Sequence, residues 1–145
     1  MAEQSKEQKK TPTRPLPKLT EMDTAPFWLA TKGKAFRYQQ CNNCDTVVWH
    51  PRAHCTGCVD GDLQWKTSAG HGTVYSFSVV RQSYHPFFRT QVPYAVAYVD
   101  LDEGPRFLTN VVGVDDPLTQ VEIGQRVELE WEEHEELSIP LVKPI

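Results

Sequence analysis

The feature that most constrains this chain is the spacing of its four cysteines. They form two pairs, Cys41-Asn42-Asn43-Cys44 and Cys55-Thr56-Gly57-Cys58, which are separated by ten residues. Two thiolates three positions apart can curl around one metal ion, and a short hairpin can bring a second such pair to its opposite side. The spacing therefore predicts a zinc ribbon.

The predicted metal site is closed. The four cysteines offer Zn²⁺ four thiolates and leave no position for water, which is typical of structural rather than catalytic zinc. His50 and His54 lie nearby in the sequence, but with four thiolates available we expect neither to coordinate. A rubredoxin-type iron site uses the same ligands. Zinc is favoured over iron because no electron-transfer motif accompanies the cysteines.

Composition is typical of a globular protein in a reducing compartment. The chain is 39% hydrophobic and 23% charged, and no apolar run approaches the roughly 20 residues that a membrane-spanning helix needs. The N-terminal stretch MAEQSKEQKK carries lysines but no apolar core, unlike a secretory signal. Thiols arranged for metal binding also require reducing conditions. We therefore expect a cytoplasmic protein with no membrane contact and no disulfides.

The first 33 residues predict an arm and a short helix. Residues 1–20 lack apolar periodicity and contain three prolines, which predicts a flexible arm. Residues 21–33 predict a helix with Thr24 as the N-cap, Pro26 in the first turn and Gly33 just beyond the C-terminus. So short a helix is not stable alone, so we expect it to dock on the rest of the protein.

The remaining chain divides into a zinc ribbon over residues 34–70 and a barrel over residues 71–145. The ribbon is too small to fold without a crosslink, so metal supplies much of its stability. Five strands, with a hairpin between the second and third, predict an OB-type barrel, and an SH3-like barrel is the alternative. The fold class is thus mainly β. The expected barrel strands are Thr73–Val80, Tyr94–Val99, Arg106–Val112, Arg126–Trp131 and Leu137–Val142.

No stretch of the chain contains a recognisable catalytic motif. The five histidines and the serines lie in no nucleophile pattern, and neither common phosphate-binding glycine loop is present. The carboxylates between Glu128 and Glu133 alternate along a predicted strand, which indicates a solvated face rather than an acid–base pair. We therefore expect no catalysis by this chain alone.

One loop carries unusual apolar area. Residues 81–93, between the first two barrel strands, include Tyr84, Phe87 and Phe88 where a loop normally faces water. These rings either fold back and plug the end of the barrel or form a contact patch for a partner or ligand. The sequence leaves both alternatives open.

Several short motifs follow one another between residue 20 and residue 145. They are Phe27-Trp28, the cysteine pairs around Pro51-Arg52, Gly70–Ser76, His85-Pro86-x-Phe88, Pro93-Tyr94, Leu101–Arg106, Thr109-Asn110 and Val112-Gly113. In this order and spacing they resemble one known family. It is the group of zinc-ribbon and OB-fold proteins, once catalogued as a domain of unknown function, that accompany thiolase-like enzymes acting on acyl-CoA thioesters.

The resemblance implies a non-catalytic accessory subunit of a hetero-oligomer built around a thiolase dimer. Family members occur with acetoacetyl-CoA thiolases and with aldolases that cleave side chains from steroid-CoA intermediates, so the resemblance favours a steroid side-chain aldolase in lipid metabolism. It also implies that the cysteines hold a structural Zn²⁺ and that the OB portion lies beside the acyl-CoA site. The residues expected to contact partner or acyl-CoA are Tyr84, His85, Phe87, Phe88, Arg89, Arg106 and Asn110.

Charge separates this function from its main competitor, a nucleic-acid-binding module. From His71 onward there are twelve acidic and five basic side chains, whereas residues 1–18 carry five basic side chains against two acidic ones. An OB fold that follows a nucleic-acid backbone needs a basic groove with stacking aromatics. The acidic barrel half disfavours nucleic acid. It also predicts that the partner, rather than this chain, holds the CoA phosphates.

Overall fold

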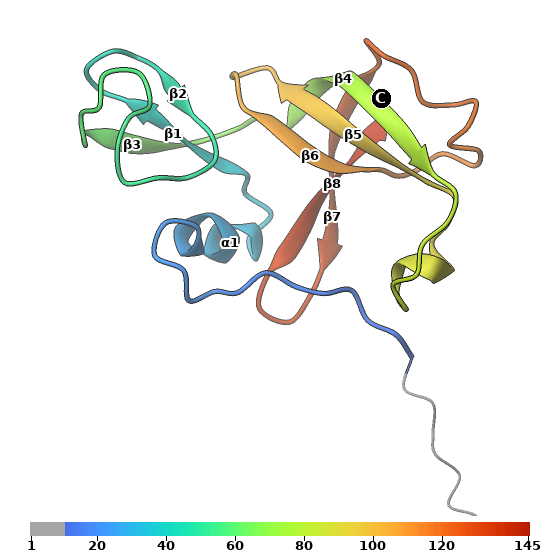
Figure 1. The fold of residues 1–145 in the computed structure, drawn as a ribbon. Coiled ribbons are helices and arrows are strands. Elements are labelled where there is room, and N and C mark those ends of the chain that lie inside the picture. The colour runs from blue at the N-terminus through green and yellow to red at the C-terminus, as the bar shows by residue number, and fades with distance from the viewer. Residues whose placement is uncertain (1–10) are drawn as a thin grey trace, which may run out of the picture.

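The computed structural model describes residues 11–145, so the first half of the expected arm lies outside the described residues. Residues 11–145 form one α-helix, a short 3-10 helix, a small three-stranded sheet and a barrel (Figure 1). The elements are α1 (Ala25–Thr31), β1 (Arg37–Cys41), β2 (Val47–Val48), β3 (Leu63–Thr67), β4 (His71–Val80), η1 (Phe88–Thr90), β5 (Tyr94–Leu101), β6 (Arg106–Val111), β7 (Arg126–Glu133) and β8 (Ser138–Pro144).

The barrel has the connectivity of an OB fold. Its strands follow the order β4-β5-β6-β8-β7, and β7 returns to pair with β4 and close the barrel. Only the pairing of β6 with β8 is parallel. This order excludes the SH3-like alternative and confirms the five predicted strands, whose ends differ from the prediction by at most two residues.

Strand periodicity decides which side chains fill the barrel. Along β5, Ala95, Ala97, Val99 and Leu101 point inward and are at most 3% exposed, while the intervening side chains point outward. This period of two is what the pleat of a strand imposes. The inward side chains form the core.

Helix α1 docks on both sheets through aromatic rings. The ring of Phe27 lies 5.1 Å from that of Phe36 and 5.2 Å from that of Trp49, and Phe36 lies 4.9 Å from Phe107 of β6. Edge-on and tilted contacts at such distances are favourable for aromatic pairs. No helix within residues 11–145 is long and apolar enough to cross a membrane.

The expected ends of the helix are only partly correct. Thr24 takes the N-cap position but does not cap, because the preceding turn, closed by a hydrogen bond from Ala25 N to Glu21 O, holds it at φ −102° and ψ −19°. Its hydroxyl donates to Glu21 Oε2 instead, at 3.4 Å. At the other end the left-handed residue is Lys34, with φ 59°, and not Gly33.

Thr31 fastens α1 to the barrel. Its side chain is fully buried, and its hydroxyl donates to Trp28 O at 2.5 Å and accepts from the Ser138 amide of β8 at 3.1 Å. The Ser138 amide is therefore satisfied by a side chain 107 positions away. This contact ties the helix to the start of the last strand.

A carboxylate fixes the connection between ribbon and barrel. Glu103, in the turn between β5 and β6, accepts hydrogen bonds at 2.7 Å from Ser68 Oγ and from the Ala69 amide. Charge-assisted bonds of this kind are stronger than neutral ones. Glu103 therefore holds the ribbon against this end of the barrel.

Candidate functional site

The four cysteines converge as the sequence predicts. Their sulfur atoms all lie within 4.8 Å of one another, with 3.6 Å between Cys41 and Cys58 and 3.5 Å between Cys44 and Cys55. A tetrahedron with Zn–S bonds of about 2.3 Å has S–S edges of about 3.8 Å. The sulfur atoms thus fit one tetrahedral ion, and a zinc ribbon with a structural Zn²⁺ is the cofactor assignment.

In each knuckle a backbone amide donates a hydrogen bond to the first of the two sulfur atoms. The Asn43 amide donates to Cys41 Sγ at 3.4 Å, and the Gly57 amide donates to Cys55 Sγ at 3.2 Å. The Thr46 hydroxyl and backbone lie against Cys44 and lower the pKa of its thiol to about 6. Since metal binds the thiolate form, these hydrogen bonds favour coordination.

The two nearby histidines lie outside the cysteine cluster. Among residues 11–145, the four cysteines are the one group of three or more potential ligands close enough to share an ion. His50 instead stacks on Trp49 with 5.1 Å between ring centroids. A site with four thiolates and no further ligand is closed, so its chemistry is structural.

The aromatic loop, residues 81–93, combines both alternatives that the sequence left open. Phe87 and Phe88 are half-buried, and Phe88 lies 5.8 Å from Tyr94 at the start of β5. Tyr84 is 80% exposed, and His85 and Arg89 are exposed as well. One part of the loop therefore packs on the barrel end, while the other part presents side chains to solvent.

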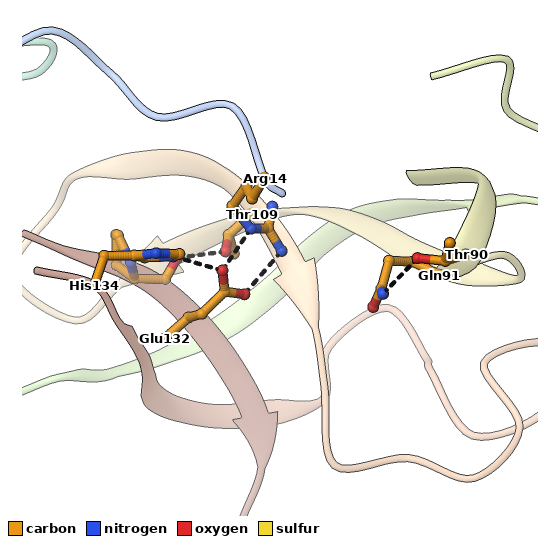
Figure 2. A network of polar contacts seen from close by, with 7 residues as sticks. Arg14, Thr90, Gln91, Thr109, Glu132 and His134 are labelled. Carbon is orange, nitrogen blue, oxygen red and sulfur yellow. Dashed lines mark hydrogen bonds and ion pairs between the residues drawn. The ribbon is translucent and has the colours of Figure 1, made fainter. Parts of the chain in front are cut away.

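Arg14 joins this loop to the β7–β8 hairpin, a contact that sequence reasoning missed. Its guanidinium donates to both oxygens of Glu132, at 2.7 and 3.0 Å, and lies 5.0 and 5.3 Å from the ring centroids of Phe87 and Phe88. Figure 2 shows the Glu132 carboxylate between Arg14 and His134, whose Nε2 lies 2.7 Å from it. A cleft of about 490 Å³ lies between residues 12–16, the aromatic loop and the β7–β8 hairpin.

Opposing effects set the pKa of Glu132. Burial raises it, but hydrogen bonds from Arg14 and His134 outweigh burial and hold the pKa below its ordinary value. Within residues 11–145 the His134 side chain hydrogen-bonds to Glu132 alone. The Glu132 carboxylate therefore holds Arg14 in place and is itself hydrogen-bonded to His134.

The other two predicted contact residues lie at opposite ends of β6. Asn110 is near the aromatic loop and donates to Ala95 O at 3.2 Å. Arg106 lies at the far end, where it pairs with Asp100 at 2.6 Å and covers the Tyr75 ring at 3.5 Å from its centroid. The structure thus places Asn110 with the aromatic loop and Arg106 away from it.

Most basic side chains of the barrel are already neutralised. Arg106 pairs with Asp100, Arg126 with Asp102 and Lys143 with Glu130. Within the described residues, only Arg81 and Arg89 of the barrel's basic side chains have no carboxylate partner. Two free arginines do not make the continuous basic groove that a backbone-binding OB fold needs.

The zinc ribbon and the barrel each match the model of a known protein domain. The profile of the ChsH2 rubredoxin-like zinc ribbon domain matches residues 35–64, and that of the ChsH2 C-terminal OB-fold domain matches residues 65–132. Among solved structures, the chain is similar to one described as "Ltp2-ChsH2(DUF35) aldolase", with 37% identity and a TM-score of 0.78 over 90% of this chain and 98% of that one. A DUF35 protein of unknown function from Sulfolobus solfataricus, at 14% identity and a TM-score of 0.60, shares the fold.

Curated relatives share the same region. A probable enoyl-CoA hydratase alpha subunit of Thermomonospora curvata is 38% identical over 141 residues, 95% of this chain and 42% of that protein. A DUF35 domain-containing scaffold protein of Methanothermobacter thermautotrophicus is 33% identical over 91 residues, 62% of this chain and 66% of that protein. The chain thus spans less than half of the first relative and about two thirds of the second.

Proposed function

The chain belongs to the ChsH2 (DUF35) family, and from this premise we propose that it is a non-catalytic accessory subunit of a thiolase-like acyl-CoA enzyme. The observation that carries the proposal is the similarity to the Ltp2-ChsH2(DUF35) aldolase structure, which extends over 98% of the matched chain at 37% identity. Similarity over the whole of a subunit supports a shared role as a subunit. The scaffold proteins among the relatives support the same role.

The proposed reaction of the complex is retro-aldol cleavage of a CoA thioester, with a steroid side chain as the substrate. The aldolase named for the matched structure supports the reaction class, and the hydratase subunit among the relatives supports an acyl-CoA substrate. Within this assignment the thiolase-like subunit supplies the catalytic groups. We place the complex in the cytoplasm, where reducing conditions keep the four cysteines available for zinc.

The chemistry of this chain suits a supporting role. Its metal site is closed by four thiolates, and its Glu132–His134 pair is engaged with Arg14. Zinc holds the ribbon, and the aromatic cluster of Phe27, Phe36 and Phe107 joins ribbon, helix and barrel. These contacts hold ribbon, helix and barrel together, which suits a subunit that stabilises a partner.

The charge of the barrel half indicates which part of CoA each subunit contacts. The barrel half carries twelve acidic and five basic side chains, most of the latter paired, so it repels the phosphates of the CoA nucleotide. The partner therefore binds the nucleotide, and this chain lies beside the pantetheine or acyl part. Tyr84, Phe87 and Phe88 of the aromatic loop are the side chains proposed for that contact.

The experiment is co-expression with the thiolase-like protein encoded nearest the gene, followed by size-exclusion chromatography. The proposal expects one peak that contains both proteins at a fixed ratio and retains zinc. A Cys58→Ser variant, which loses one zinc ligand, is the control and should co-elute poorly. Separate peaks for two folded proteins would contradict the proposed function.

A further inference from the structure

An exposed apolar surface covers the three strands β4, β5 and β6. Tyr75 on β4, Tyr98 on β5 and Leu108 on β6 are 52%, 46% and 56% exposed. Tyr98 lies directly opposite Leu108 in the strand register, and Ser76 lies opposite Tyr98. Tyr98 and Leu108 are therefore cross-strand neighbours, and Tyr75, in the β-bulge beside Ser76, extends the surface onto β4. Figure 1 shows these three strands side by side.

This surface is uncharged in an otherwise acidic half of the molecule. We define the outer face as the outward-pointing residues between the Asp100–Arg106 pair at one end and the aromatic loop at the other. None of them is ionisable at neutral pH. They are Tyr75, Ser76, Ser78, Val80, Tyr94, Val96, Tyr98, Leu108 and Asn110.

The two ends of the outer face are held in place. At one end Arg106 is fixed between Asp100 and the Tyr75 ring, so its charge is balanced and its planar group lies over an aromatic surface. At the other end Tyr94 lies 5.8 Å from Phe88 of the aromatic loop. The face is therefore continuous with the loop that we propose to contact the partner's acyl-CoA site.

We infer that the outer face is the docking surface for the thiolase-like subunit; this rests on the proposed function and specifies the interface. Tyr and Arg are the side chains that most often anchor interfaces, and an interface core is depleted of charge. Ordered strands lose little conformational freedom on binding, which favours affinity. Within the described residues, Arg81 and Arg89 at the loop end of the face have no carboxylate partner, so the fitting partner surface has an apolar centre and acidic side chains beside the loop.

The test compares two leucines of nearly equal exposure. Leu108, 56% exposed, lies in the outer face, whereas Leu29, 57% exposed, lies on α1, which packs against β1 and β8. Each is changed to Glu in the full chain, and affinity for the purified thiolase-like subunit is measured by calorimetry. Tyr98→Ala is a milder second variant. Zinc content and thermal melting verify that each variant is folded, and light scattering gives the mass of each protein alone.

The expected result is a loss of affinity of at least about tenfold for Leu108→Glu and a smaller loss for Tyr98→Ala, with Leu29→Glu unchanged. If the unaltered chain binds the partner and both outer-face variants bind equally well, the inference is overturned while the proposed function stands. If the unaltered chain does not bind, the proposed function fails and the inference fails with it. A dimer of the chain alone that Leu108→Glu dissociates would assign the face to a second copy and overturn the inference.

Discussion

Replacement of Thr31 by Val tests whether one buried hydroxyl fastens the helix to the barrel. Valine keeps the shape of threonine but cannot accept the hydrogen bond from the Ser138 amide, which at 1% exposure of that residue has no access to water. A buried donor left without a partner costs about 1–3 kcal/mol. We expect Thr31→Val to lower the free energy of unfolding by that amount.

Thr31→Ser is the matched control because it keeps the hydroxyl and removes only a methyl group. Burial of one such group is worth about 0.8 kcal/mol, so the serine variant should lose less than the valine variant. Urea denaturation with zinc present gives both values. Hydrogen exchange of the Ser138 amide gives a local readout, and only Thr31→Val should speed it. A valine variant as stable as the unaltered protein, or a serine variant that loses more, would refute the reasoning.

Three further predictions follow from the zinc site, the strand packing and the Arg14 contact. Removal of zinc by a chelator, or Cys44→Ser, should abolish hydrogen-exchange protection over residues 37–67, because the ribbon depends on its metal; retained protection would contradict this. Gly72→Ala should destabilise the barrel by about 1–3 kcal/mol in urea denaturation, because an added Cβ would lie 2.6 Å from Asp100 O. The control Gly33→Ala should be nearly neutral in the same assay, because its Cβ would meet nothing closer than 3.7 Å. Arg14→Ala should raise the pKa of Glu132, because it removes the guanidinium that lowers this pKa. A carboxyl group with a depressed folded-state pKa stabilises the fold above its unfolded pKa and loses that contribution as the pH falls through the folded value, so the variant should also lose stability above that range. Carboxyl NMR titration measures this pKa; an unchanged value, or an equal change in the control Lys18→Ala, would refute the role of Arg14.

Sequence reasoning succeeded where one local pattern dictates the structure. The two cysteine pairs define a metal site because ligand spacing alone constrains the chain around an ion. The alternation along Thr73–Val80 and Arg126–Trp131 predicts strands because a pleated strand has a period of two. The closed barrel and the zinc ribbon therefore followed from the sequence.

The features that were missed depend on residues far apart in the chain. Arg14 meets a carboxylate 118 positions away, and no local pattern indicates that partner. The outer face was hidden because Tyr94–Val99 is nearly all apolar, so only the strand register shows that Tyr98 points outward and Val99 inward. Gly33 was expected just beyond the end of the helix because glycine adopts the left-handed conformation easily, but that conformation occurs one residue later, at Lys34.

The most direct test of the central claim is a retro-aldol assay on an acyl-CoA thioester, with the thiolase-like subunit titrated by this chain. An accessory subunit should be inactive alone and should raise the activity of the partner until a fixed stoichiometric ratio is reached, after which further addition has no effect. Partner activity that is the same at every concentration of the chain, or cleavage by the chain alone, would contradict the account.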